Sequence, residues 1–226
     1  MRRFLAAFLA VIPLAGNAQP APETSGGLPY GTLTKPLSDF MGLPPPSRDK
    51  LIFIERVVSR AGTPLSPPPR LTIFAAGGAL VVPVAADGTV TLPLTAALRA
   101  ENPTVGIDQP RGTMSLEIIL AVAPPPHLRM PYTWFVSAGA QARDAAAIAA
   151  HSNAGLLASL FAPRLRGLAI SFAPGSRGQV FYLVGASREV LSPGANGTTE
   201  LRLDRKQAEA EVEFSAAPTL IEPLID

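Results

Sequence analysis

The chain has 226 residues, with 19 Lys and Arg against 17 Asp and Glu, and it contains no Cys. Without Cys the chain can form no disulfide, no thiolate nucleophile and no Cys-based metal site. Charged residues make up only 16% and hydrophobic residues 47%, so folding must rely on burying an apolar core. The 25 Pro and 19 Gly residues punctuate short elements and argue against a mainly helical fold.

Residues 1–18 have the features of a secretory signal peptide. Two Arg residues precede the apolar run Phe4 to Ala15, and small residues occupy the −3 and −1 positions of a cleavage site. We therefore expect cleavage between Ala18 and Gln19 and a periplasmic mature protein. The apolar run is shorter than the roughly 20 helical residues that span a bilayer, so no transmembrane anchor is expected after cleavage.

Export changes how the charge is interpreted. Loss of Arg2 and Arg3 from the 19 basic residues leaves 17, which equals the number of acidic residues. A mature chain of zero formal net charge gives no reason to expect nucleic acid or an anionic membrane surface as a partner.

Residues 19–48 are predicted to form a Pro- and Gly-rich tail or linker. The run Pro44-Pro45-Pro46 favours an extended polyproline conformation. Two outcomes stay open for this segment. One is a free, disordered spacer, and the other is a segment that docks on the following module through Tyr30, Phe40 and Leu43.

Residues 49–122 are predicted to form a first β-sandwich module of short antiparallel strands. The strongest signal is Asp87-Gly88, because a type I′ hairpin turn needs positive φ at both central positions. Thr95 is a suitable N-cap for a short helix that Asn102-Pro103 would end. The expected strands cover residues 51–58, 71–74, 80–84, 89–94, 104–108 and 113–122.

Residues 123–165 are predicted to be a linker followed by a helical segment. An Ala-rich stretch from Ala138 to Phe161 carries a narrow apolar stripe at helical spacing. Gly155 weakens this helix, so two helices that break near Ser152-Asn153 are an equal alternative. Pro163 is expected to end the segment.

Residues 166–226 are predicted to form a second β-sandwich module that repeats the first. An offset of 109 residues places Asn196-Gly197 on Asp87-Gly88, and an offset of 107 places Val212 and Phe214 on Val105 and Ile107. Internal duplication is one interpretation, and independent use of common turn chemistry is the other. The predicted fold class is mainly β with a central helical segment, as two tandem small antiparallel β-sandwich modules.

The segment VAADGTVTLPL, from Val84 to Leu94, resembles the Asp/Asn-Gly strand signature of transthyretin-like, carboxypeptidase-regulatory-type β-sandwich modules. The whole chain is similar to exported proteins of Gram-negative bacteria with this layout. The resemblance covers Asp49 to Val122 and, more faintly, Leu168 to Leu224. It implies a sandwich fold and brings no catalytic residues, because such modules are usually non-catalytic. The second copy departs from the signature by having Arg202 in place of Pro93.

Motifs for catalysis, metals and cofactors are not found. The two His residues, His127 and His151, have no second His or carboxylate at metal-ligand spacing, so no metal and no cofactor are expected. No nucleophile elbow, P-loop or dinucleotide fingerprint is present, and no catalytic residue is assigned. Asp144 lies about two helical turns before His151, which leaves a periplasmic hydrolase as an alternative to a solvated helix surface.

The candidate ligand-binding residues are His127, Arg129, Tyr132 and Trp134, which place aromatic groups beside a cation between the two modules. Packing of Trp134 against a sandwich is the simpler alternative. The functional hypothesis is an exported, non-catalytic binding or envelope-assembly accessory protein, whose partner is another envelope protein or a small ligand. A third possibility is a purely structural β-module that adds strands to a neighbour through an exposed edge.

Overall fold

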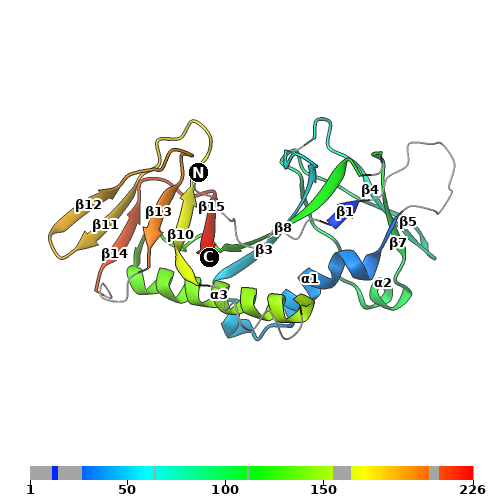
Figure 1. Ribbon diagram of the computed structural model, residues 1–226, viewed down its shortest axis with the longest axis horizontal. Coiled ribbons are helices and arrows are strands. Elements are labelled where there is room, and N and C mark those ends of the chain that lie inside the picture. The colour runs from blue at the N-terminus through cyan, green and yellow to red at the C-terminus, as the bar shows by residue number, and fades with distance from the viewer. Residues whose placement is uncertain are drawn as a thin grey trace. The chain divides into compact units, whose positions relative to one another are not determined.

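The computed structural model describes residues 12–14, 27–63, 65–110, 112–154, 164–203 and 209–225. These residues form a mainly β fold of four antiparallel sheets with few helices, as the sequence predicted (Figure 1). In chain order the elements are β1 (Ile12–Leu14), β2 (Leu28–Pro29), α1 (Tyr30–Gly42), η1 (Pro45–Ser47), β3 (Leu51–Ser59), β4 (Leu71–Ala75), β5 (Gly78–Val82), β6 (Thr89–Val90), α2 (Ala96–Glu101), β7 (Thr104–Ile107), β8 (Met114–Val122), β9 (Arg129–Pro131), α3 (Tyr132–Ala154), β10 (Leu165–Ser171), β11 (Val180–Val184), β12 (Ser187–Leu191), β13 (Thr199–Arg202), β14 (Glu211–Phe214) and β15 (Leu220–Ile225).

The described residues divide into two compact units, here called the first and second modules. Of the described residues, those within 12–42 and 53–119 form the first module, and those within 43–52 and 120–225 form the second. This division departs from the predicted boundaries at the segment 19–48. Its helical part belongs to the first module, and the part from Leu43 onward belongs to the second.

The first module is a sandwich of two sheets, with strand orders β1-β8-β3-β6 and β2-β7-β4-β5. Alternate residues of strands from both sheets point into one core, as expected for half-buried antiparallel strands. The core comprises Tyr30, Leu33, Val57, Leu71, Ile73, Val82, Val90, Leu92, Leu98, Val105, Ile107, Met114 and Leu116. The short helix α2 is capped as predicted, because the Thr95 side chain accepts a hydrogen bond from the Leu98 N–H at 3.1 Å.

Helix α1 docks on the first module through Tyr30. The Tyr30 N–H donates to the Pro103 carbonyl at 2.8 Å, and the Tyr30 hydroxyl donates to the Pro93 carbonyl. Tyr30 and Leu33 are both buried in the core, and Phe40 stacks on Phe53 with ring centroids 5.5 Å apart. Of the two outcomes left open for this segment, the docked one is observed for α1.

The second module is also built from two sheets, with orders β13-β10-β15 and β12-β11-β14-β9. Helix α3 begins at Tyr132, whose N–H donates to the Ala210 carbonyl at 2.8 Å and whose hydroxyl donates to the Arg202 carbonyl at 2.9 Å. The buried residues of this core include Tyr132, Phe135, Ala138, Ala142, Leu168, Ile170, Val180, Tyr182, Leu201, Val212, Phe214 and Ile221.

The two modules share one strand order. Sheet β5-β4-β7-β2 corresponds to β12-β11-β14-β9, and β6-β3-β8 corresponds to β13-β10-β15. The registers also coincide: Ile107 and Val105 pair with Leu71 and Ile73, as Phe214 and Val212 pair with Val180 and Tyr182. The correspondence extends to Tyr30 and Tyr132, whose hydroxyl groups donate to the equivalent carbonyls of Pro93 and Arg202. Internal duplication, as the origin of this likeness, stays a hypothesis.

Helix α3 begins six residues earlier than the predicted helix and runs without a break through Ser152-Asn153. Gly155, which was expected to weaken the helix, and Pro163, which was expected to end it, lie outside the described residues. The earlier start follows from Tyr132 and Phe135, whose burial anchors the first turn in the core. The helix propensity of the residues alone favours the Ala-rich part. In the folded chain, packing of the apolar face of the helix decides where the helix begins.

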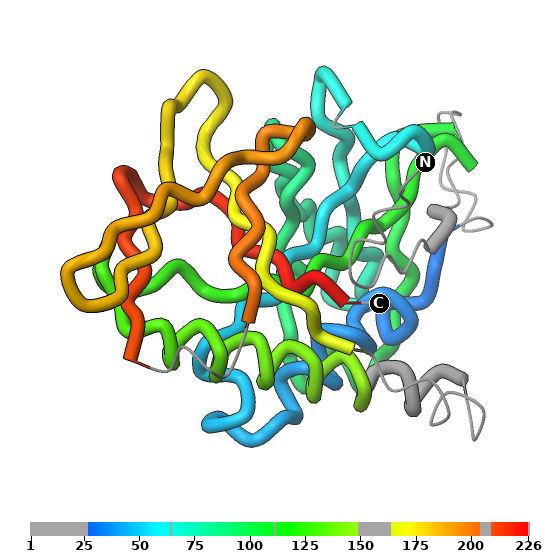
Figure 2. Tube along the Cα trace, turned by 60° about the vertical axis from the view of Figure 1, so that its left-hand side comes forward, coloured from blue at the N-terminus to red at the C-terminus, as the bar shows by residue number. Residues whose placement is uncertain are grey.

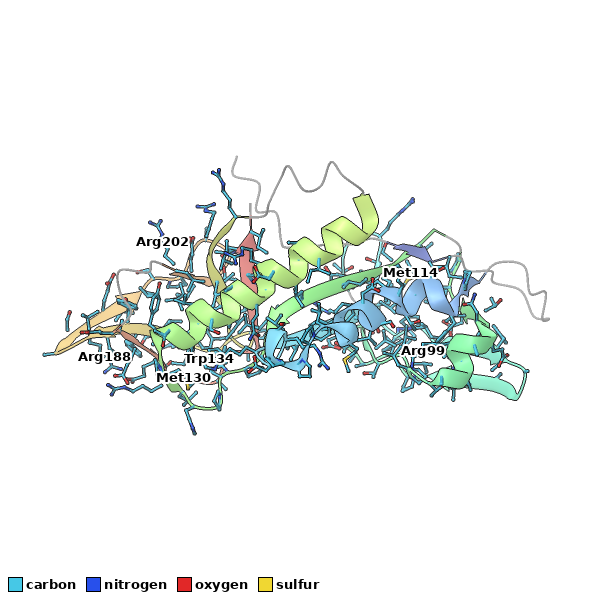
Figure 3. All side chains as sticks on the ribbon, turned by 90° about the horizontal axis from the view of Figure 1, so that it is seen from below. Arg99, Met114, Met130, Trp134, Arg188 and Arg202 are labelled. Atoms are coloured by element: carbon cyan, nitrogen blue, oxygen red, sulfur yellow. The ribbon has the colours of Figure 1, made fainter. Side chains whose placement is uncertain are left out.

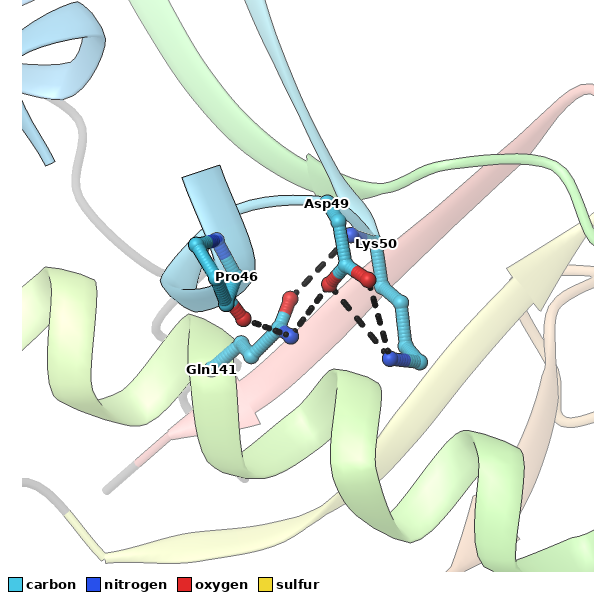
Figure 4. A network of polar contacts seen from close by, with 4 residues as sticks. All are labelled: Pro46, Asp49, Lys50 and Gln141. Carbon is cyan, nitrogen blue, oxygen red and sulfur yellow. Dashed lines mark hydrogen bonds and ion pairs between the residues drawn. The ribbon is translucent and has the colours of Figure 1, made fainter. Parts of the chain in front are cut away.

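The segment before β3 is fixed to α3 by Gln141 (Figure 4). The Gln141 amide nitrogen donates to the Pro46 carbonyl at 2.9 Å and to the Asp49 carboxylate at 2.5 Å, while its oxygen accepts from the Lys50 N–H at 3.1 Å. The hydrogen bond from Gln141, together with Lys50, holds the pKa of Asp49 below its usual value. This network explains why Leu43–Ile52 belongs to the second module.

Two further observations concern the expected export signal and anchor. Strand β1 lies within the predicted signal peptide and pairs with Met114, Ser115 and Leu116 of β8. Among the described residues, no helix is both long and apolar enough to cross a membrane.

Candidate functional site

The four candidate ligand-binding residues differ in exposure, because they run from the loop before β9 through that strand into the first turn of α3. His127 and Arg129 are exposed, and Tyr132 is fully buried. The Arg129 Nε donates a hydrogen bond to a carboxylate oxygen of Glu211 at 3.0 Å, and this hydrogen bond, together with the Glu211 charge, raises the pKa of Arg129. These two residues belong to neighbouring antiparallel strands, so the pair is a surface ion pair across a ladder.

The aromatic members of this set make packing contacts. Tyr132 meets Tyr182 edge to face at 5.6 Å, and Trp134 meets Phe135 edge to face at 4.9 Å. Trp134 lies in the first turn of α3 and is partly buried (Figure 3). The packing interpretation therefore accounts for Tyr132 and Trp134, and a ligand-binding role for the whole set stays a prediction.

The proposed acid–base pair of the hydrolase alternative is described only in part. Asp144 is exposed and forms an ion pair with Arg143 at 2.7 Å. The side chain of His151 lies outside the described residues. Among the side chains that the structure describes, no three His, Cys, Asp or Glu residues gather in a way that could hold a metal ion.

The second module has a cleft of about 600 Å³ at the end of its sandwich. One wall is the β10–β11 loop, residues 172–179, which Figure 2 shows in yellow, projecting beyond the strands. The other wall is formed by the end of β12 and the turn that leads into β13. Its lining includes Phe172, Arg177, Val190, Leu191, Asn196 and Thr198.

The first module is closed at the equivalent position. There β3 continues alongside the Asp87-Gly88 turn, so that the Val57 N–H donates to the Gly88 carbonyl at 2.8 Å and Arg56 reaches the Asp87 carbonyl at 3.0 Å. In the second module β10 ends at Ser171, and the chain turns away through a loop that contains Gly175 at φ 78°. The early end of β10 therefore opens the cleft.

Burial of the two turn glycines reflects the same difference. Gly88 is buried, and a Cβ placed on it would lie 2.5 Å from the Val57 carbonyl oxygen. Gly197 is exposed, and a Cβ placed on it would have no neighbour within 4 Å. Both residues have positive φ, so their turns are alike, and only the surroundings differ.

Local hydrogen bonds between residues of the cleft lining fix the two walls of the cleft. The Asn196 side-chain oxygen accepts from the Thr198 N–H at 3.2 Å and from the Thr198 hydroxyl at 2.7 Å. The Gly178 N–H donates to the Ser176 hydroxyl at 3.1 Å, and a Cβ on Gly178 would overlap the Phe172 ring. These local bonds are the Asx- and Ser/Thr-turn type that fix loop geometry.

The chemistry of the lining suits binding. Phe172, Val190 and Leu191 provide apolar surface, and Arg177 is the one charged residue among the described lining residues. No ion pair to Arg177 is found in the described part of the chain, and Arg177 is exposed. A guanidinium beside apolar surface matches a ligand with an apolar body and an anionic group. The described lining contains no His, Asp or Glu that could serve as a general base.

Glu55 is a second unusual group, located in the first module. It lies on β3 opposite Val90, it is only 3% exposed, and its Oε1 has no hydrogen-bond partner among the described residues. Burial raises the pKa of Glu55 to about 7, against the lowering effect of a hydrogen bond from the Leu92 backbone. The equivalent position of the second module is Ile170, which pairs with Thr199 and is fully buried.

Sequence reasoning missed both the cleft and Glu55. The cleft depends on where β10 ends, and its only sequence signal is the run Ala173-Pro174-Gly175, which interrupts a strand earlier than in the first module. The signal for Glu55 was a charge at a core-facing position of the apolar strand LIFIERVV. Comparison with family models, with curated proteins and with solved structures finds no match to this chain.

Proposed function

We propose that the protein is an exported, non-catalytic binding protein of the periplasm, and that the cleft of the second module holds a small ligand with an apolar body and one anionic group. The observation that carries this proposal is the cleft itself, with Arg177 beside Phe172 and Leu191. The export part of the proposal rests on the signal-peptide features of residues 1–18.

A role as an envelope-assembly accessory is the second candidate, and it is favoured by the exposed sheet edges. Each module has a terminal hairpin with exposed apolar side chains, Leu80 and Val81 in the first and Val184 and Val190 in the second. An exposed edge strand offers unpaired backbone groups to an incoming strand. The hydrolase alternative has less support, because Asp144 is exposed and already paired with Arg143.

Native mass spectrometry of protein purified from its own periplasm tests the cleft. The wild-type protein should carry a bound small molecule, and Arg177→Ala should lose most of it because the guanidinium that pairs with the anion is gone. Arg202→Ala is the matched control, since Arg202 is a highly exposed Arg of the same module outside the cleft lining. A wild-type protein without an adduct, or equal occupancy in both variants, would contradict the proposal.

A defined probe gives an independent measurement. The fluorescent anion 8-anilinonaphthalene-1-sulfonate combines an apolar body with one sulfonate, as the cleft requires. We expect it to bind the wild-type and Arg202→Ala proteins equally, and to bind Arg177→Ala at least tenfold more weakly, in line with the loss of one charge-assisted interaction. Equal affinity for the two variants would place the probe elsewhere and would argue against an anion site at Arg177.

A further inference from the structure

The first module has a sheet edge without charge. Strand β5 has a neighbour on one side only in the order β2-β7-β4-β5. Leu80 is 44% exposed and Val81 is 52% exposed on this strand. No charged residue occurs from Leu71 to Ala86, so the hairpin itself carries no charge, although the Glu101 carboxylate accepts a hydrogen bond from the Ala76 N–H at its turn. Edge strands of natural proteins usually carry charged side chains, which prevent pairing with the strands of other chains.

The backbone groups that this edge offers follow from the register. The Asp108 N–H donates to the Arg70 carbonyl at 3.2 Å, so alternate residues from Arg70 direct their backbone groups to β7. The residues between them, Leu71, Ile73 and Ala75, bond to their β5 partners Val82, Leu80 and Gly78. Residues Ala79 and Val81 therefore direct their N–H and C=O groups away from the sheet.

The second module provides an internal comparison. Its edge strand β12 occupies the same place, with Arg188, Glu189 and Val190 where β5 has Ala79, Leu80 and Val81. Arg188 pairs with Glu213 at 2.9 Å and lies over the Phe181 ring at 3.8 Å, at the outer end of the hairpin (Figure 3). One module thus has a charged edge and the other an uncharged one.

We propose that β5 pairs with β5 of a second copy of this chain, antiparallel and about a two-fold axis at Leu80. In this register Ala79 of each copy lies opposite Val81 of the other, so all the outward backbone groups of both strands are hydrogen-bonded. Gly78 lies opposite Val82, so the five residues of β5 match without overhang. The hairpin turn ends the ladder on one side, and Pro83, which lacks an N–H, ends it on the other.

Charge selects a second copy as the occupant. An uncharged strand pairs with this edge without desolvating a charge, and β5 itself is such a strand. Pairing with β12 would place Arg188 or Glu189 against the apolar residues of β5 and break the contact between Arg188 and Glu213. The symmetric pair also brings the two Leu80 side chains together, which covers apolar surface that the core leaves open.

The mass in solution tests this proposal. Sedimentation velocity across a concentration series should show the mature wild-type chain approaching twice the monomer mass. Val81→Lys should stay monomeric, because the Lys of each copy would lie against the apolar β5 strand of the other copy. Ser187→Lys, an exposed position of the edge strand β12 outside the cleft lining, should associate like the wild-type chain. Circular dichroism checks that both variants are folded.

A crosslink tests the register. The chain has no Cys, so Leu80→Cys introduces a single thiol, and residues at the two-fold axis form a non-hydrogen-bonded pair with side chains close enough for a disulfide. Oxidation should give a covalent dimer of Leu80→Cys and little of Glu189→Cys. A monomeric wild-type chain, association that survives in Val81→Lys, or equal crosslinking of the two Cys variants would overturn the proposal.

Discussion

Glu55 shows how one residue departs from the plan that both modules share. Its carboxyl group is buried on β3, where the second module has the fully buried Ile170. A carboxylate in that position loses its hydration and recovers one backbone hydrogen bond, from Leu92. Burial therefore favours the protonated form. Tyr30, whose pKa is also raised by burial, is an ionisable group close enough to interact with Glu55.

The stability of the first module should consequently depend on pH through Glu55. The folded-state pKa is about 7 and the ordinary value is 4.5, so between these values the folded state binds more protons than the unfolded state. The free energy of unfolding then falls as pH rises from about 4.5 to about 7, by about 3 kcal/mol, and is constant above that range. Urea unfolding at pH 5 and pH 8 measures this loss.

Two variants separate Glu55 from the other titrating groups. Glu55→Gln keeps the shape of the side chain and removes its titratable carboxyl group, so the stability of this variant should change less between pH 5 and pH 8 than that of the wild-type chain. At pH 8 the variant should be the more stable protein. Glu189→Gln, an exposed change on β12, should follow the wild-type profile. A wild-type chain that gains stability toward pH 8 relative to Glu55→Gln would show that Glu55 is ionised at little cost.

At the scale of elements, the turns were the most predictable features. Asp87-Gly88 and Asn196-Gly197 were correctly placed at turns, but the type I′ geometry predicted for Asp87-Gly88 is wrong, because only the two glycines, and not Asp87 or Asn196, have positive φ. The turns end at the glycines instead: the Gly88 N–H donates to the Ala85 carbonyl at 2.9 Å, and the Gly197 N–H donates to the Gly194 carbonyl at 3.0 Å. The register of β7 and β14 also followed the predicted offset. Tyr30 and Tyr132 were missed as a pair, because their role depends on β2 and β9 joining distant strands. Such long-range pairing leaves no periodic signal in two or three residues.

The two turn glycines give a matched test of the closed and open ends. Gly88→Ala and Gly197→Ala share the conformational cost of positive φ, about 1–2 kcal/mol. Gly88→Ala adds an overlap with the Val57 carbonyl oxygen, which breaks the bond that closes the first module. We expect Gly88→Ala to be the more destabilising substitution in urea unfolding. Equal losses would mean that the first module opens at this end as readily as the second.

At the scale of the whole molecule, composition and architecture act together. Equal numbers of basic and acidic residues in the predicted mature chain leave little electrostatic repulsion between copies. A chain of this kind depends on local charges to block its sheet edges, and β12 has them whereas β5 does not. Pairing through β5 is consistent with this distribution of charge, because no charged side chain of β5 has to be desolvated when the strands pair.

Cleavage of the predicted signal peptide has a structural consequence that can be measured. Strand β1 lies in the segment to be removed and pairs with Met114, Ser115 and Leu116 at one edge of its sheet. The periplasmic protein should begin at Gln19 by intact mass, and amide exchange of these β8 residues should be faster than in a chain that retains residues 1–18. Strand β8 should stay folded, because it keeps β3 on its other side and Met114 and Leu116 remain in the core. A periplasmic protein that retains residues 1–18, or unchanged exchange after their loss, would contradict this expectation.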